Sequence, residues 1–288
     1  INDASKAYAA ANEERLATVR KISDLKNERL ALELKIKDEV QALYRSDKAK
    51  QRAAAEDLER AKRDKAAAER AFAGEFGHCV GRTLRCERER RVMGDSIFTR
   101  ILSYTSAACD ARMAGAMIPV MSNSGSGNQG IAATLPVVVY AEQTAATEQQ
   151  TIRALVLSHL TVIYIKQSLG RLSALCGCVV AATGSSCGIT YLMGGDYGQV
   201  AAAVKNMIAN LTGMICDGAK PSCSMKLTSG VSTAVISAMM AMDGHCVTPV
   251  EGIIEEDVDK CIRNLTAIGR DGMNETDRVV LGIMTHKC

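Results

Sequence analysis

Charged and polar positions dominate the first part of the chain, and apolar positions dominate the rest. Between residues 22 and 43 the apolar residues follow an a/d spacing that two charged residues interrupt. This spacing predicts about three heptads of coiled coil. From residue 45 to residue 70 the apolar positions are mostly alanines, so we expect a weakly packing helix that folds back as a hairpin near Ser46 and Asp47.

Glycine, proline and cysteine occur only after residue 73. Residues 1–73 contain none of the 23 glycines, 4 prolines or 11 cysteines, and charges of both signs are interleaved along them. This composition is typical of long exposed helices. We therefore expect a helical or coiled-coil arm over residues 1–73 and a compact domain over residues 74–288. The arm either docks or oligomerises the protein, or is a solvated extension or a foreign segment joined to the domain.

The compact domain is predicted to be almost entirely α-helical. Aromatic residues make up 3% of the chain, while Ala, Met and Cys are frequent, and such small or flexible side chains suit closely packed helices better than a β-sandwich. Apolar spacing predicts helices at 142–168, 200–211, 232–242, 254–265 and 276–284, with a buried helix and turn within 172–195. Strand patterns are confined to residues 135–140.

Charge and cysteine content narrow the possible functions. A net charge of +3 over 288 residues gives no electrostatic case for nucleic acid. No run is typical of a membrane span, because the charge-free stretches 113–140 and 172–195 are interrupted by small polar residues. The odd number of cysteines, without a secretory pattern at the start, indicates reduced thiols that are buried or metal-bound in a cytoplasmic protein.

A dense run of small polar residues is the first candidate site. Residues 122–130 read Ser-Asn-Ser-Gly-Ser-Gly-Asn-Gln-Gly between two strongly apolar segments. The run is either a flexible surface loop or, as its flanks indicate, a loop held in the core. Glycines let backbone N–H groups approach a ligand, and a helix opened by residues 131–135 would direct its positive end at a carboxylate. The spacing matches neither a Walker loop nor a dinucleotide-binding motif.

Three cysteines from two segments are the second candidate site. Cys176 begins a Cys-Gly-Cys sequence, and Cys216 and Cys223 bracket a segment broken by glycine and proline. Three thiolates can bind three corners of an iron–sulfur cluster and leave one iron open for chemistry; alternatively, these are buried thiols that fill a core. If Cys176 and Cys178 share a helix, their side chains point about 200° apart, so we do not expect both to bind one cluster. The other cysteines, Cys109 among them, are expected to be ordinary core thiols.

Two further side chains are candidates for binding or structure. Arg112 could bind a substrate carboxylate through two hydrogen bonds, or pair with Asp110 two residues earlier. His159 lies within an apolar helical pattern, and the four histidines show no metal-ligand spacing such as His-x-x-x-His. We therefore interpret His159 as a core residue.

Four motifs together resemble the L-cysteine desulfidase family, which is related to the α-type domain of iron–sulfur L-serine dehydratases. They are the sequences at 106–113, 121–131, 172–176 and 213–219. The similarity runs from Gly77 to near the carboxyl end, whereas residues 1–73 do not resemble the family. It implies a [4Fe–4S] cluster held by Cys176, Cys216 and Cys223.

The resemblance also implies an activity. L-cysteine would undergo β-elimination to sulfide, and the aminoacrylate would hydrolyse to pyruvate and ammonia. The carboxylate and amine of this small amino-acid substrate would be bound by the polar loop, together with Arg112. The loop residues implied are Ser122, Asn123, Ser124, Gly125, Ser126, Asn128 and Gln129.

The chain departs from the family in one respect. Family members carry a preceding domain whose Gly-Cys-Thr-Glu-Pro motif supplies the proposed proton acceptor, and no cysteine precedes Cys79 here. The catalytic base is thus unknown: a separate domain or subunit supplies it, the chain is incomplete, or the protein is a non-catalytic structural or assembly subunit that retains the lyase fold. Cys288 either reaches the open iron, as in related serine dehydratases, or is a stray thiol. We also expect a homo-oligomer.

Overall fold

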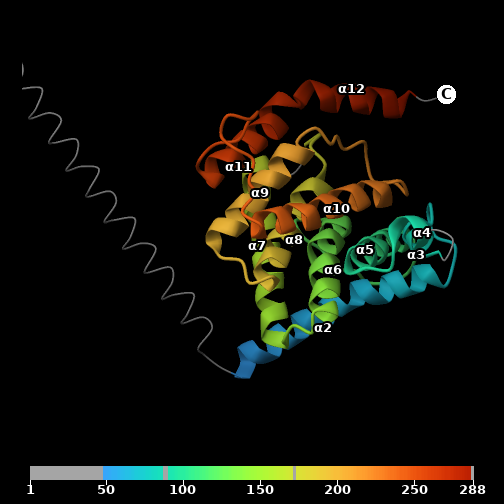
Figure 1. Cartoon of the computed structure of the whole chain (residues 1–288). Helices are drawn as coiled ribbons and strands as arrows, with labels where there is room; N and C mark the ends of the chain where they lie inside the picture. The colour runs from blue at the N-terminus through green and yellow to red at the C-terminus, as the bar shows by residue number, and fades with distance from the viewer. Residues whose placement is uncertain (1–47, 87–89, 171–172, 287–288) are drawn as a thin grey trace, which may run out of the picture. The chain divides into compact units, whose positions relative to one another are not determined.

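The computed structural model describes residues 48–86, 90–170 and 173–286. The chain divides into two compact units, Ile1–Ala55 and Glu56–Cys288. The second unit is built of helices, with no strand among the described residues (Figure 1), so the all-α prediction is confirmed. The elements are α2 (Lys48–Phe72), α3 (Val80–Arg85), α4 (Arg90–Met93), α5 (Ile97–Met113), α6 (Gly127–Gln143), α7 (Glu148–Leu169), α8 (Gly177–Leu192), α9 (Tyr197–Leu211), α10 (Cys223–Met242), α11 (Val258–Ala267), a π-helical turn (Ile268–Gly272) and α12 (Asn274–Thr285).

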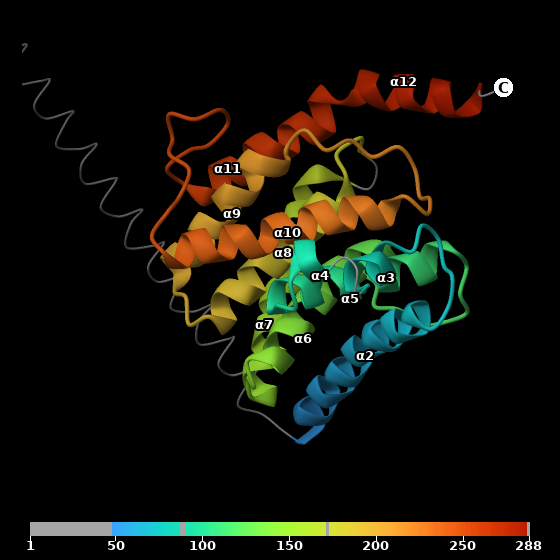
Figure 2. The same cartoon turned by 45° about the vertical axis from the view of Figure 1, so that its right-hand side comes forward.

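Helix α8 is the central element of this unit. It packs against α6, α7, α9 and α10, which surround it in Figure 2. The backbone of α7 comes so close that a Cβ at Gly184 would lie 2.4 Å from the Ser158 carbonyl oxygen, and one at Gly188 would lie 2.9 Å from that of Ala154. Glycines in α8 therefore permit a helix crossing that any larger residue would push apart.

The prediction of a strand at residues 135–140 is wrong, because these residues lie within α6. The helix begins after Ser126, whose side chain accepts a hydrogen bond from the Gln129 N–H and so caps the first turn. The residues Val137 to Val139 are all buried. A short run of buried valines has no periodicity that separates strand from helix, and packing against α5, α7 and α8 overrides their β propensity.

The other predicted helices are confirmed, with different ends in some cases. Helices α7, α9 and α11 start at side chains that accept a hydrogen bond from the N–H three residues later, namely Thr147, Asp196 and Asp257. Helix α10 starts at Cys223 rather than near residue 232. It is long and apolar enough to cross a membrane, but it packs against α5, α8 and α9 as a core helix does.

The second half of α2 belongs to the helical unit. Its alanines are buried at positions 61, 67, 68 and 71, and Lys65 forms an ion pair of 2.8 Å with Glu142 of α6. These residues belong to the compact unit that starts at Glu56. Alanines give a weak sequence pattern, yet they let one helix approach its neighbours closely.

Several predicted features lie outside the described residues. They are the coiled coil between residues 22 and 43, the hairpin near Ser46 and Asp47, and Cys288.

Candidate functional site

The 122–130 segment forms a tight turn followed by the first turn of α6. Asn123 and Ser126 exchange two backbone hydrogen bonds, of 3.2 and 3.0 Å. Between them Ser124 and Gly125 both have positive φ, a conformation that glycine adopts readily and serine rarely. The segment buries the side chains of Asn123, Asn128 and Gln129. Residues 127–130 are thus held in the core, whereas Ser122, Ser124 and Gly125 in the turn are exposed, so the expectation of a loop held in the core is met only in part.

His159 of α7 fixes this turn from the side. Its Nδ1 accepts a hydrogen bond from Asn123 Nδ2 at 2.9 Å, and its Nε2 lies 3.0 Å from Thr134 Oγ1. Because an amide nitrogen can only donate, the ring proton is assigned to Nε2, which donates to Thr134. Both ring nitrogens are engaged within the protein, in agreement with the interpretation of His159 as a core residue.

Arg112 faces the loop and is not paired with Asp110. Its Nη1 donates to Asn128 Oδ1 at 2.9 Å, and a Cβ at Gly127 would lie 2.3 Å from its Nε. The Asp110 carboxylate instead accepts from the Gly81 N–H at 3.1 Å, and burial raises the pKa of this carboxyl. Among the described residues Arg112 has no carboxylate partner, so its charge is available to an anionic ligand.

Gln129 lies against Gly177, where the loop meets the cysteine segment. Gln129 is in the first turn of α6, and Gly177 is the first residue of α8. A Cβ at Gly177 would lie 2.8 Å from Nε2 and 2.9 Å from Cδ of Gln129, so a larger residue here would force the end of the Gln129 side chain to move. Gln129 is 9% exposed, and its Oε1 has no partner among the described residues. An unsatisfied buried acceptor costs about 1–3 kcal/mol, which indicates a place for a donor from a ligand.

A backbone bridge joins the two cysteine segments. The Cys176 N–H donates to the Met214 carbonyl at 3.0 Å, and the Cys216 N–H donates to the Ala174 carbonyl at 2.6 Å. Together they form an isolated antiparallel bridge. Cys223 starts α10 and lies within electrostatic reach of Cys178 in the first turn of α8. The segments carrying the three predicted cysteines therefore meet near the start of α8.

Two thiols that the sequence analysis set aside lie in the same place. Cys178 hydrogen-bonds with Cys176, and this bond and burial raise its pKa, with smaller effects of Cys109 and Cys223. The two cysteines do not share a helix, which was the condition for their side chains to point apart, because Cys176 is the N-cap of α8 and has extended backbone. Cys109 donates to Asn128 Oδ1 at 3.5 Å. A sequence signal existed for Cys109, since it precedes Arg112 by three residues and so shares its helix face.

These thiols suit iron chemically, but they do not form a ready-made metal site. Cys176 and Cys223 are buried, and Cys216 is half-buried. Within the described part of the chain, no three His, Cys, Asp or Glu side chains are grouped to hold a metal ion. Burial raises the pKa of Cys109 well above its usual range, so this thiol is neutral at pH 7. The convergence of the backbone segments fits a cluster, whereas the side chains would have to rearrange and lose protons to bind one.

Charged side chains order the segment between Cys216 and Cys223. Asp217 forms ion pairs with Lys220 and Lys226, and Lys226 also donates to the Ile215 carbonyl at 2.7 Å. Lys166 of α7 lies within electrostatic reach of the Cys216 thiol; burial lowers the pKa of Lys166, and a Cys216 thiolate opposes that effect. A cation beside a thiol favours the thiolate that metals require.

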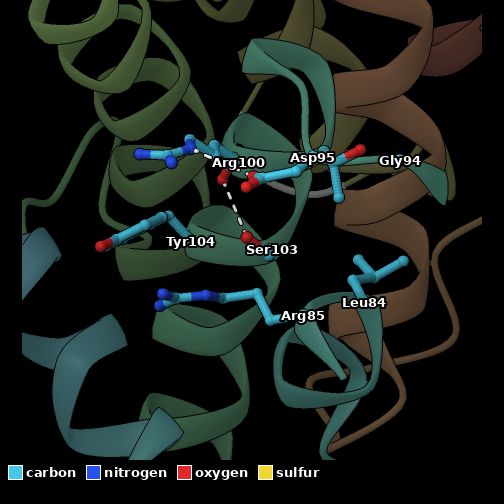
Figure 3. A pocket seen from close by; sticks show the side chains of 8 residues that line it. Leu84, Arg85, Gly94, Asp95, Arg100, Ser103 and Tyr104 are labelled. Atoms are coloured by element: carbon cyan, nitrogen blue, oxygen red, sulfur yellow. Dashed lines mark hydrogen bonds and ion pairs between the residues drawn. The ribbon is translucent and has the colours of Figure 1, made fainter. Parts of the chain in front are cut away.

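A small polar cavity lies elsewhere on the unit (Figure 3). It has a volume of about 70 Å³ and is lined by Leu84, Arg85, Gly94, Asp95, Thr99, Arg100, Ser103 and Tyr104. Arg100 pairs with Asp95 at 3.5 Å, and Arg85 stacks 4.2 Å from the ring centre of Phe72. Its two arginines have partners within the protein, and no lining residue comes from the loop or the cysteine segments. We assign it no part in the site.

Comparison with known proteins gives the family. The serine dehydratase alpha chain family profile matches residues 6–282. The match includes most of residues 1–73, so the expectation that this segment is unlike the family is wrong. Of the two related families that the motifs resemble, the match supports the serine dehydratase alpha chain family, which is generally associated with iron–sulfur clusters. It does not confirm the L-cysteine desulfidase family.

Two relatives show how much of a longer protein this chain represents. A UPF0597 protein of Bacteroides fragilis is 76% identical over 230 residues, and one of Oleidesulfovibrio alaskensis is 52% identical over 230 residues. Each alignment covers 80% of this chain and 54% of the relative, so the chain spans about half the length of these curated relatives. No solved structure matches. The family match over nearly the whole chain shows that this protein belongs to the serine dehydratase alpha chain family.

Proposed function

We propose that this chain is the substrate- and cluster-binding part of a lyase that removes the β-substituent of a small L-amino acid. The contact between Gln129 and Gly177 carries the proposal, because it joins the buried end of the polar loop to the helix start that bears Cys176. Membership of the serine dehydratase alpha chain family supports the lyase class. The motifs favour L-cysteine as the substrate, and the family description points to L-serine.

The loop offers groups that complement an amino-acid zwitterion. Gln129 Oε1 is a buried acceptor without a donor and would accept from the substrate ammonium. Arg112 lies beside Asn128 and would bind the carboxylate, assisted by the positive end of α6. Ser126, the cap of that helix, limits how many N–H groups remain for the ligand. The other loop residues proposed to line the site are Ser122, Asn123, Ser124, Gly125 and Asn128.

We further propose that Cys176, Cys216 and Cys223 hold a [4Fe–4S] cluster. When bound with three protein ligands, such a cluster supplies an open iron that acts as a Lewis acid. The ion pairs of Asp217 would keep the segment between the second and third cysteines in place. The loop residues would hold the substrate, and the buried surroundings would keep water from it.

The elimination balances without an added oxidant or reductant. A base removes the Cα proton, and the Cβ–S bond of L-cysteine breaks with its electron pair leaving on sulfur; in L-serine the Cβ–O bond breaks. The aminoacrylate then takes up water and becomes pyruvate and ammonia. We assign the base to a separate domain or subunit, in keeping with the half-length match to the relatives. A homo-oligomer and a cytoplasmic location are part of this proposal.

An anaerobic assay tests the proposal. The chain is loaded with iron and sulfide, alone and with the unmatched part of the Bacteroides fragilis relative, and pyruvate is measured from L-cysteine and from L-serine. Gln129→Leu should lower the rate about tenfold or more, because it removes a hydrogen bond to a charged group. Gln143→Leu, at the exposed end of α6, is the matched control. No pyruvate from either amino acid in either arrangement would rule the lyase out.

One observation favours a second function. No three metal-binding side chains are grouped within the described residues, as expected of a non-catalytic structural or assembly subunit that keeps the lyase fold. Such a subunit would fold fully and take up no iron under the same loading conditions. A helical protein that stays free of iron and sulfide would therefore support this alternative.

A further inference from the structure

Asp64 of α2 is a buried carboxyl beneath the start of the polar loop. It is 0% exposed, and its Oδ1 accepts a hydrogen bond from the Met121 N–H at 2.6 Å. Its Oδ2 has no hydrogen-bond partner among the described residues. A buried ionised carboxylate normally needs a cation or several donors, whereas this one has a single donor.

The Met121 peptide is held from two sides. A Cβ at Gly130 would lie 2.0 Å from the Met121 carbonyl oxygen and 2.7 Å from the Ser122 nitrogen, so the backbone of α6 packs directly on this segment. Asp64 binds the N–H of the same residue. Met121 immediately precedes the loop. Ser126, five residues further on, caps the start of α6. Asp64 thus anchors the side of the loop that the helix cap does not reach.

The surroundings of Asp64 are apolar. One turn earlier on α2, Ala61 packs with Val137 and Val138 of α6, with Ala154 and Leu155 of α7, and against Met121. The titratable groups that these elements carry nearby interact with one another or with the loop: Lys62, Lys65, Glu142, Glu148 and His159. None of them shifts Asp64. Burial raises the pKa of Asp64 to about 7, and only the Met121 N–H opposes it.

We propose that Asp64 is a positioning residue that holds the start of the 122–130 loop, and that its uncharged form holds the loop most tightly. The uncharged acid keeps one oxygen as acceptor for the Met121 N–H and places no net charge in the apolar layer. Ionisation keeps the hydrogen bond but favours opening, because the open state lets water reach the carboxylate. The inference concerns the loop itself, so it stands or fails independently of the proposed lyase.

Amide hydrogen exchange tests this inference on the full chain. Exchange of a peptide covering residues 121–130 is measured at pH 6 and pH 8 and corrected for the intrinsic rate. If the carboxyl has a pKa of about 7 in the closed form and about 3.9 when hydrated, protection should fall roughly tenfold between the two pH values. Asp64→Asn retains the acceptor without a charge, so its protection should be high and equal at both.

Two more variants complete the test. Asp64→Ala removes the acceptor and should lose protection at both pH values; Asp196→Asn, at the exposed cap of α9, should behave like the unsubstituted chain. Full protection in Asp64→Ala would overturn the anchoring role. An unchanged pH dependence in Asp64→Asn would overturn the role of the charge. If Asp64→Ala does not fold, the comparison of Asp64→Asn with the parent decides the second point, and anchoring is decided by Asp64→Leu under the same criterion.

Discussion

The side-chain amide of Gln129 lies against the backbone of Gly177. This contact brings together the polar loop and the cysteine segment, both of which the proposed reaction requires. Gln129 belongs to the loop and the first turn of α6, while Gly177 follows Cys176 at the start of α8. The amide is buried, and its oxygen has no donor among the described residues. A ligand at this junction would meet both the polar loop and the thiols.

A methyl group added at Gly177 should push the Gln129 side chain away from the start of α8. Gly177→Ala would place a Cβ 2.8 Å from Gln129 Nε2, which forces the amide to move; because this is the end of a flexible side chain, we expect a loss of only about 1 kcal/mol of unfolding free energy. The denaturation midpoint measures the loss. Gly282→Ala is the matched control, because a Cβ at that position in α12 meets nothing within 4 Å. Equal stability of the two variants would contradict the tight contact.

Arg112 should contribute to carboxylate binding rather than to folding. Arg112→Gln removes the charge beside Asn128, and we expect KM for the amino acid to rise about tenfold or more, since hydrogen bonds to charged groups contribute about 1.5–3 kcal/mol. Kinetics of the loaded enzyme measure this effect. Arg153→Gln, on the exposed side of α7, should leave KM unchanged. An unchanged KM in Arg112→Gln would show that the substrate carboxylate binds elsewhere.

The thiols around the loop should react slowly when no metal is bound. Burial raises the pKa of Cys109, so the reactive thiolate is scarce at pH 7 and becomes abundant only in strongly alkaline solution. Iodoacetamide labelling of the native chain, followed by mass spectrometry, should modify exposed Cys86 long before Cys109. Equal labelling of the two cysteines at pH 7 would contradict the burial of Cys109.

Asp64 should make stability depend on pH in a predictable direction. Its pKa is raised from 3.8 to about 7 in the folded protein, so the unfolded chain releases the proton first. Its contribution is fully present below pH 3.8 and is lost as the pH rises to 7. The loss is at most about 4 kcal/mol, at 1.36 kcal/mol per pKa unit.

Urea unfolding at pH 4 to 8 measures this dependence. Asp64→Asn should match the parent at the acidic end and exceed it in stability at pH 8. Parallel curves for the two proteins over this range would contradict the assignment. Asp196→Asn again serves as the control, because its side chain is exposed.

Sequence patterns predicted the helices better than the contacts between them. Apolar spacing located α7, α9, α11 and α12, because apolar positions recur along these segments at helical intervals or in runs long enough for a helix. The pattern failed for α6, whose valines are buried on all sides, and it undervalued the buried alanines of α2. In both cases packing against neighbouring helices determines the structure, and a local sequence pattern carries no information about that packing.

The candidate site divides in the same way. The polar loop and the cysteine segments could be identified from residue types and spacing alone. The contacts of Cys178 and Asp64 could not, because each depends on how separate helices pack; for Cys109 the spacing to Arg112 gave a signal only for a shared helix face. Cys178 meets Cys176 only because α8 starts after Cys176, and Asp64 meets Met121 across 57 residues of chain.

Iron and sulfide content after anaerobic loading tests the central claim most directly. We expect about four irons and four sulfides per chain, reduced in Cys176→Ser, Cys216→Ser and Cys223→Ser but not in Cys246→Ser, which lies outside the site. A chain that binds no iron, or binds it equally in all four variants, would contradict a cluster at the start of α8.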